Sequence, residues 1–186
     1  MTLLALLLSY LLGSIPNGLW LCRALWHVDL RQHGSHNIGA TNAWRTLGKG
    51  PGFLVFFLDM LKGLLAVWLG EMLVGTPLVM ILCGVLAIVG HSLSLFLRFH
   101  GGKGVATGLG VILMLMPKVT GIVFLVWLLL VLATRYVSLG SIVAAALVPV
   151  LALVFGYPAL YVVFGVLAAA LIIVRHRSNI TRLLNG

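Results

Sequence analysis

Glycine surrounds a single lysine in a short segment between two apolar stretches. Residues 99–110 read FHGGKGVATGLG, with Lys103 between Gly102 and Gly104. Bare backbone can approach an anion closely, and the free N–H groups at the start of a helix attract negative charge. From these residues alone, the segment is either a plain turn or a cradle for phosphate. A nucleotide-binding P-loop is excluded, because Gly104 stands where that motif requires Ser or Thr.

A second polar segment, residues 34–42, reads GSHNIGATN and lies between Arg31 and Arg45. Its Ser, Asn and Thr side chains could form a compact hydrogen-bonding surface, and its small residues would let backbone N–H groups reach an anion. The same residue types are also the usual material of an ordinary polar loop. The two flanking arginines favour a site for a phosphorylated ligand.

A third polar segment, RHRSNITRLL at residues 175–184, follows the last apolar stretch. His176 and Asn179 are three residues apart, so they would share one helical face and could act as a unit. The arginines of this segment could instead simply bind lipid phosphates.

The three acidic residues, Asp29, Asp59 and Glu71, limit the possible catalysis. They provide no paired carboxylates for a metal ion or for glycoside hydrolysis, and no Ser-His-Asp set is evident. His91 has no acid a few residues on, so we expect it to be a packing or interface histidine. We predict no metal site and no cofactor. An enzyme with this sequence would work by positioning and electrostatics rather than through a strong protein base.

The elements that must position these segments are membrane helices. The chain is 62% hydrophobic and 8% charged, whereas a soluble domain carries about 25% charged residues. A membrane span needs about 20 apolar residues. The sequence therefore predicts an all-α, polytopic membrane helical bundle in a single domain, residues 1–186, with the first helix retained rather than cleaved as a signal peptide. Seven transmembrane helices are expected, at about 2–22, 53–74, 77–97, two within 105–133 divided by a turn at Pro117, 139–155 and 158–174.

The positive charges orient the predicted bundle. Twelve Lys and Arg residues give a formal charge of +9, and ten of them fall after spans one, three and five or in the carboxyl tail, against Lys118 alone on the other side. The positive-inside rule then places the carboxyl terminus in the cytoplasm and the amino terminus outside. Lys62 lies within the second span, three residues after Asp59, which predicts a neutralising pair that fixes helix register.

The motifs extend over nearly the whole chain: GSIP at 13–16, VDLRQHGSHNIGATN at 28–42, FFLDMLKG at 56–63, GH at 90–91, GGKGVATGLG at 101–110, RYVSLGSI at 135–142 and RHRSNITRLLNG at 175–186. In this order they resemble the bacterial membrane acyl-phosphate:glycerol-3-phosphate acyltransferases (the PlsY family). The resemblance implies transfer of a fatty acyl group from acyl phosphate to the 1-hydroxyl of glycerol 3-phosphate. The products would be lysophosphatidic acid and inorganic phosphate, in phospholipid biosynthesis. Family members usually continue past the final glycine with an acidic residue, but we do not expect the chemistry to depend on it.

The resemblance also implies which residues form the site. The catalytic group would comprise Ser35, Arg45, Lys103, His176 and Asn179. Substrate phosphates and their surroundings would be bound by Asn37, Gly39, Thr41, Asn42, Gly101, Gly102, Gly104, Thr107 and Ser141. We expect a monomer in the bacterial cytoplasmic (inner) membrane, with the active site at its cytoplasmic face. The expected partners are acyl phosphate, glycerol 3-phosphate and membrane lipid, and no nucleic acid.

Two other functions compete with acyl transfer. Glycine-broken helices and buried charge also mark transporters, here for small phosphorylated anions. A transporter would need polar groups through the membrane midplane, however, and only Asp59 and Lys62 are obvious there. A lipid-binding scaffold would explain the basic tail but not the glycine-rich loop. Within the enzyme reading, a serine acyl-enzyme through Ser35 is the less favoured route, since no base neighbours that residue in the sequence.

Overall fold

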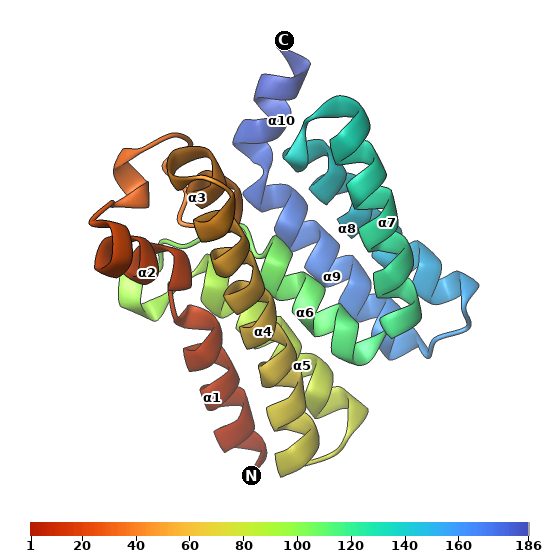
Figure 1. The fold of residues 1–186 in the computed structure, drawn as a ribbon. Coiled ribbons are helices and arrows are strands. Elements are labelled where there is room, and N and C mark those ends of the chain that lie inside the picture. The colour runs from red at the N-terminus through yellow and green to blue at the C-terminus, as the bar shows by residue number, and fades with distance from the viewer. Residues whose placement is uncertain (186) are drawn as a thin grey trace. The chain divides into compact units, whose positions relative to one another are not determined.

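Helices make up almost all of the chain. The computed structural model describes residues 1–185, which contain ten α-helices, two short 3-10 turns and no strand (Figure 1). The α-helices are α1 (Thr2–Ser14), α2 (Asn17–Trp26), α3 (Ala40–Leu47), α4 (Lys49–Leu73), α5 (Pro77–Ser92), α6 (Val105–Leu115), α7 (Pro117–Thr134), α8 (Val137–Val154), α9 (Ala159–Arg175) and α10 (Arg177–Leu184), and the 3-10 turns are η1 (Leu30–Gln32) and η2 (Leu95–Leu97). The all-α prediction is therefore confirmed.

Each of the seven predicted spans coincides with helix, but the first is broken. The axes of α1 and α2 differ by 43°. Ile15 has an extended backbone ahead of Pro16, which has no N–H to continue the helical hydrogen bonds. The break leaves the Ile15 carbonyl available to other partners, and this carbonyl reappears in the buried contacts described below.

Helix length supports fewer spans than the seven predicted. Four helical stretches are long and apolar enough to cross a membrane alone, or up to six spans if the bent pairs α1–α2 and α9–α10 each count as one. The helix α6 has only 11 residues between Gly104 and Pro117. At about 1.5 Å per residue it covers roughly half of a bilayer core of about 30 Å.

Two short amphipathic helices lie within the polar segments. The segment 27–52 contains α3, and the tail contains α10, whose axis is bent by 62° from that of α9. The sequence analysis missed α3 as a helix, because its polar face dominates the composition of an eight-residue segment. Arg45 lies in the last turn of α3 rather than on a loop. A helical tail was already implied by the face that His176 and Asn179 were expected to share, and α10 agrees with it.

The chain divides into two compact units, Met1–Met114 and Leu115 onward. In the first unit, α1, α4 and α5 pack side by side (Figure 1), and α3 packs on α4. Close backbone contacts bring α6 against α4. A Cβ on Gly63 would meet the Thr107 carbonyl, and a Cβ on Gly110 would meet the Met60 carbonyl. In the second unit, α8 packs against both α7 and α9.

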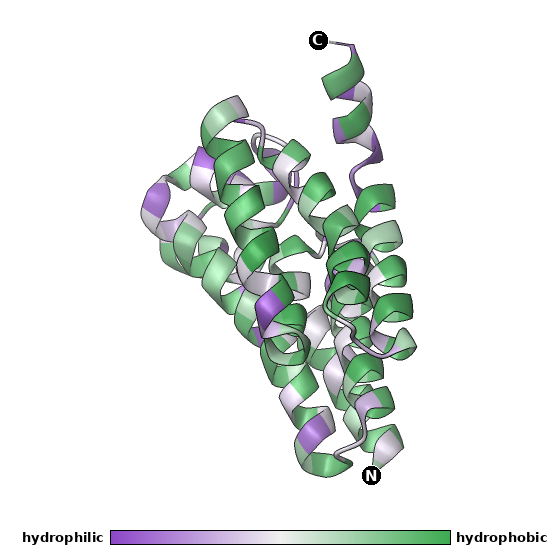
Figure 2. Ribbon diagram, turned by 90° about the vertical axis from the view of Figure 1, so that its right-hand side faces the viewer, coloured by the Kyte–Doolittle hydropathy of each residue, from purple (hydrophilic) through white to green (hydrophobic). Residues whose placement is uncertain are grey.

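The helices consist mostly of hydrophobic residues, as the predominantly green ribbons of Figure 2 show. Many of these apolar side chains are exposed. Large apolar residues such as Leu129, Leu132 and Val154 are more than half exposed. In a membrane protein this surface contacts lipid, so these exposures need no partner protein. Unlike them, Asp59 and Lys62 are buried, and their side chains lie 3.1 Å apart. This confirms the predicted pair.

Candidate active site

The turn between η1 and α3 is built around the amide of Asn42. Its Nδ2 group lies within hydrogen-bonding distance of the carbonyls of Leu30, His33 and Asn37, at 2.9, 3.0 and 2.8 Å. Its Oδ1 atom accepts from the backbone N–H of Ser35, at 3.0 Å. Because Asn42 is 1% exposed, its polar atoms are used within the protein. This residue shapes the segment that was predicted to bind substrate.

The other predicted residues of this turn are more accessible. The Asn37 side chain accepts a hydrogen bond from the backbone N–H of Gly39 at 2.9 Å, directly ahead of α3. Ser35 is partly buried, whereas Thr41 and Arg45 are exposed. Thr41 and Arg45 are four residues apart on α3, so they share one face of that helix. The turn therefore presents a hydroxyl and a guanidinium from one rigid element.

Asp29 neutralises part of the positive charge near this turn. Its carboxylate accepts from Arg31 Nε at 3.0 Å and Arg31 Nη2 at 2.8 Å, and it also pairs with Arg23. These hydrogen bonds, above all the one from the Arg31 side chain, hold the pKa of Asp29 well below its usual range. The same carboxylate raises the pKa of Arg31. Arg31 thus has a protein counter-ion.

The glycine-rich loop, residues 101–104, lies against the end of α5. The backbone N–H of Gly102 donates to the carbonyl of His91 at 3.0 Å. A Cβ on Gly101 would collide with that same carbonyl, and a Cβ on Gly102 would collide with Nε2 of the His91 ring. Gly104 has φ +79°, a conformation that favours glycine. The bare backbone is therefore required by close packing and by chain geometry.

The loop leads directly into α6, which begins at Val105 as the sequence predicted. Lys103 is partly buried in the loop. The predicted binding residue Thr107 is fully buried, and its hydroxyl has no hydrogen-bond partner among the atoms of residues 1–185. The hydroxyl of Ser92, beside Gly104, is buried in the same way. The N–H groups in the first turn of α6 come directly after Lys103 in the chain. A cation next to a helix amino terminus is suited to binding an anion.

Three predicted residues belong to the second unit. Ser141 is buried on α8, where its hydroxyl donates to the Val137 carbonyl at 2.8 Å and accepts from Trp127 Nε1 at 3.3 Å. His176, between α9 and α10, is 3% exposed, and its Nδ1–H donates to the Ile172 carbonyl at 2.8 Å. The backbone N–H of Asn179 donates to the carbonyl of His176 at 2.8 Å. One turn of chain therefore joins His176 and Asn179, as their spacing predicted.

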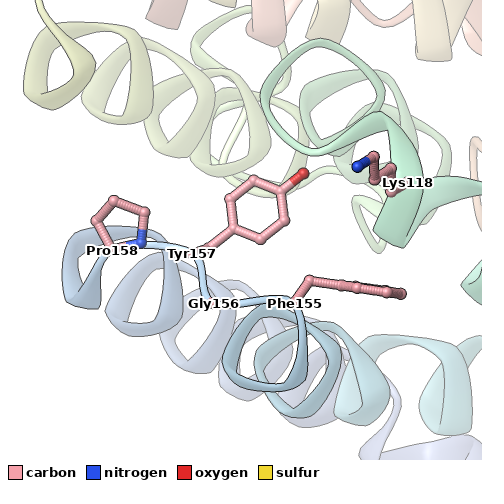
Figure 3. Close-up of a pocket in the computed structure, with 5 residues that line it drawn as sticks. All are labelled: Lys118, Phe155, Gly156, Tyr157 and Pro158. Carbon is pink, nitrogen blue, oxygen red and sulfur yellow. The ribbon is translucent and has the colours of Figure 1, made fainter.

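The second unit also contains a cavity of about 270 Å³ that none of the predicted site residues lines. Figure 3 shows its five lining residues, Lys118 at the start of α7 and Phe155, Gly156, Tyr157 and Pro158 in the α8–α9 connection. A cavity lined by one lysine and aromatic rings, open at the end of a helix pair, lacks the set of polar groups that acyl transfer would need. We do not assign it to the active site.

No group of three or more His, Cys, Asp or Glu side chains able to hold a metal ion occurs in the described part of the chain. Cys22 and Cys83 are buried free thiols. The sequence analysis missed one feature, which is that Asn17 Nδ2 donates to the buried Asp59 carboxylate at 3.1 Å. Its position beside Pro16 and Gly18, at a helix break, was the available signal.

The fold agrees with that of known membrane acyltransferases. The chain aligns along its whole length with two crystal structures of PlsY (YgiH), an integral membrane glycerol 3-phosphate acyltransferase. For the glycerol 3-phosphate form the TM-score is 0.95 and the identity 45%, and 92% of that chain is covered. For the lysophosphatidic acid form the TM-score is 0.92 and the identity 42%, again over 92% of that chain.

Sequence comparison gives the same class and then the family. The glycerol-3-phosphate acyltransferase of Syntrophomonas wolfei is 52% identical over 97% of this chain and 92% of its own length. Glycerol-3-phosphate acyltransferase 2 of Moorella thermoacetica is also 52% identical, over 100% of this chain and 95% of its own length. The family model described as glycerol-3-phosphate acyltransferase matches residues 3–186. The chain belongs to the glycerol-3-phosphate acyltransferase family, and it is a bacterial, multi-pass membrane enzyme that acylates glycerol 3-phosphate.

Proposed function

We propose that the acyl donor is acyl phosphate, that the acceptor is the 1-hydroxyl of glycerol 3-phosphate, and that the products are lysophosphatidic acid and inorganic phosphate. One observation carries this proposal: the first unit contains two basic segments whose backbone is held in a fixed conformation beside a cation. In the loop at 101–104 close-packed glycines lie beside Lys103, and the turn at 34–42, which the Asn42 amide orders, is followed by Arg45. Both proposed substrates contain phosphate. The similarity to relatives crystallised in glycerol 3-phosphate and lysophosphatidic acid forms supports the same acceptor and product here.

Within the first unit, we propose that Arg45 and Lys103 bind substrate phosphates. The exposed guanidinium of Arg45 can bind phosphate in a bidentate manner, and the first-turn N–H groups of α6 would add to the charge of Lys103. Ser35, Asn37, Gly39 and Thr41 would contact the acceptor, with Asn42 holding their backbone in place. The bare backbone of Gly101, Gly102 and Gly104 would let a phosphoryl group approach the loop closely, while the Gly102 N–H remains bonded to the His91 carbonyl. The buried Thr107 would support the loop.

From the second unit, we propose that His176 and Asn179 contact the donor, with Ser141 as a further contact. The Nδ1–H of His176 donates to the Ile172 carbonyl, which holds the imidazole ring in one orientation. Neutral Nε2 is then an acceptor, because the ring proton is on Nδ1. In this assignment the buried imidazole has a fixed orientation and acts as a hydrogen-bond acceptor through Nε2.

The reaction that we propose uses a substrate phosphate as the base. The glycerol 1-hydroxyl oxygen attacks the acyl carbon, its proton moves to a phosphate oxygen, and the bond between the acyl carbon and the bridging phosphate oxygen breaks. Inorganic phosphate leaves with that bridging oxygen. The mixed anhydride is already activated, so Arg45 and Lys103 need only orient the phosphates and stabilise the charge that develops.

The test is an assay with purified protein, glycerol 3-phosphate and a long-chain acyl phosphate. Release of inorganic phosphate equal in amount to the lysophosphatidic acid formed is the expected result. The same assay with acyl-CoA in place of acyl phosphate should give no product. Acylation from acyl-CoA alone would contradict the proposed donor while leaving the family assignment intact.

The membrane placement that we propose puts the turn at residues 34–42 and the loop at 101–104 on the cytoplasmic side of the inner membrane. The distribution of cations supports this, since Lys118 is the only cation predicted on the other side. We further propose seven membrane-crossing segments, with α6 as a short one, and a monomeric enzyme. The size of the purified protein in detergent, by light scattering corrected for bound detergent, tests the last point.

A further inference from the structure

Four polar side chains meet in the interior of the first unit, beneath the glycine-rich loop: Asn17, Asp59, Lys62 and His91. We call them the Asp59 cluster. Asp59 Oδ1 accepts from Asn17 Nδ2 at 3.1 Å, and it lies 3.1 Å from Lys62 Nζ and 3.8 Å from His91 Nδ1. Asp59, Lys62 and His91 are 2%, 3% and 5% exposed. The cluster therefore joins α2, α4 and α5 through one carboxylate.

On one side the cluster contacts the glycine-rich loop through His91. His91 accepts from the Gly102 N–H through its backbone carbonyl, while its ring Nε2 fills the position of a Gly102 side chain. The ring is thus confined between Asp59 and Gly102. A shift of the carboxylate would allow the ring to move, and the loop that contains Lys103 would lose a packing surface.

On the other side the cluster is linked to the turn at residues 34–42 through the start of α2. Lys62 Nζ donates to the Ile15 carbonyl at 2.8 Å, at the break between α1 and α2. Asn17 follows that break, and the next residue, Gly18, lies so close to the Ile38 carbonyl that a Cβ would collide with it. Ile38 belongs to the turn that Asn42 organises. The start of α2 therefore couples Asp59 to this turn by direct contacts.

Stability alone does not account for such a cluster. Removing charges from water is costly, and apolar residues of similar volume often replace a buried ion pair with no loss of stability. Hydrogen bonds and ion pairs, unlike apolar contacts, fix direction as well as distance. A polar cluster between two binding segments can therefore set their mutual orientation.

We propose that Asp59 is a positioning residue for acyl transfer: its contacts with Asn17, Lys62 and His91 hold the turn at residues 34–42 and the loop at 101–104 in the arrangement that substrate binding requires. This inference rests on the proposed function, because it takes both segments to bind substrate phosphates. Asp59 itself touches neither substrate.

The main test replaces the pair by apolar residues of similar size, in the double variant Asp59→Leu with Lys62→Met. We expect this variant to fold, with an unchanged helical circular dichroism spectrum and a melting temperature no lower than that of the wild type. Its kcat/KM should fall about 10- to 100-fold, with an increased KM for glycerol 3-phosphate, because misplacement by about 1 Å can cost that much. A folded double variant with wild-type kcat/KM would overturn the proposal.

The single variant Asn17→Ala covers the possibility that the double variant does not fold. It removes one contact to Asp59 and leaves the ion pair in place, so we expect a folded protein with a several-fold increase in the KM for glycerol 3-phosphate. Wild-type kinetics of folded Asn17→Ala would also overturn the proposal. Ser9→Ala is the matched control. It removes a buried hydrogen bond to the Ala66 carbonyl in the same unit, away from the loop, and should retain wild-type kinetics.

Lys103→Ala, assayed in parallel, separates this inference from the proposed site. If Lys103→Ala is inactive while the double variant keeps wild-type kcat/KM, the site stands and the positioning role of Asp59 is overturned. If Lys103→Ala retains wild-type activity, the loop does not bind substrate as proposed, and the inference fails with it. Loss in both variants, with Ser9→Ala unaffected, supports the inference.

Discussion

At the scale of single residues, the structure separates side chains that shape the binding segments from side chains that are available to ligands. Asn42 and Arg45 were both expected to contact substrate. The structure buries Asn42 among four backbone partners and leaves Arg45 exposed on α3. The sequence indicated that both residues belong to a phosphate-binding segment. It could not assign the two roles, because they depend on how the backbone of residues 30–42 folds around one amide.

The first residue-scale prediction concerns the base. If a substrate phosphate accepts the proton, His176→Gln should lower kcat by less than about 100-fold, since removal of a general base typically costs 10²- to 10⁴-fold. The pH–rate profile of the variant should show the same ionisations as that of the wild type. Loss of one ionisation from the profile would instead identify His176 as the base.

The second residue-scale prediction concerns Asp29. Hydrogen bonds from arginine lower its pKa in the folded protein, so its contribution to stability is fully present above the unfolded-state value of about 3.9 and is lost as the pH falls through the folded-state value. Asp29→Asn should therefore melt at a lower temperature than the wild type at pH 7. Thermal melts in detergent should show this difference shrinking below about pH 4. A difference that grows with acidification would argue against the assignment.

At the scale of elements, apolar runs and prolines in the sequence predicted where the helices lie. They did not predict how long each helix is. Pro77 and Pro117 open α5 and α7 as expected, because proline is tolerated in the first turn. The break at Ile15 was not predicted, because the apolar composition continues across it. The bend after Arg175 was not predicted either, because the length of the last apolar run does not define the direction of the helix that follows. The contact of α6 with α4 was also beyond sequence analysis, because it depends on which glycines face each other.

That contact supports a prediction for α6. Gly110→Ala would place a methyl group against the Met60 carbonyl, so α6 must move away from α4, and the loop at its start must move with it. We expect at least about a tenfold fall in kcat/KM and a lower melting temperature. Gly121→Ala in α7, where nothing lies within 4 Å of the added carbon, is the matched control. It should keep activity and gain about 0.5–1 kcal/mol from helix propensity. Equal activity of the two variants would show that the close contact is dispensable.

At the scale of the whole molecule, the predicted orientation in the membrane rests on the distribution of positive charge. The family assignment rests on the comparisons with known proteins. The net charge of +9 and its concentration in alternate connections came from the sequence alone. The seven-span expectation also came from the sequence, and helix lengths alone give four spans or up to six. The discrepancy has a physical reason, because α6 is about half as long as a span and the first predicted span is broken between α1 and α2. Segments of this kind cross a membrane only with the help of neighbouring protein.

Orientation can be tested by labelling in a background with Cys22→Ala and Cys83→Ala. Lys118 and Arg182 are both exposed and lie on opposite sides in the proposed arrangement. A membrane-impermeant maleimide should label Lys118→Cys in intact spheroplasts, and it should label Arg182→Cys only in inside-out vesicles. The reverse pattern would place the amino terminus in the cytoplasm.

The packing of His91 against the glycine-rich loop has a consequence for how this sequence can change by mutation. The atom that blocks a side chain at Gly102 is the tip of the His91 ring, whereas the atom that blocks one at Gly101 is a backbone oxygen. A genetic selection that begins from an inactive Gly102→Ala strain should thus recover second-site revertants with a shorter residue at position 91, and their activity should stay below that of the wild type because the contact between His91 and Asp59 is lost. The same selection from Gly101→Ala should return only true revertants, because no exchange of side chains removes a carbonyl.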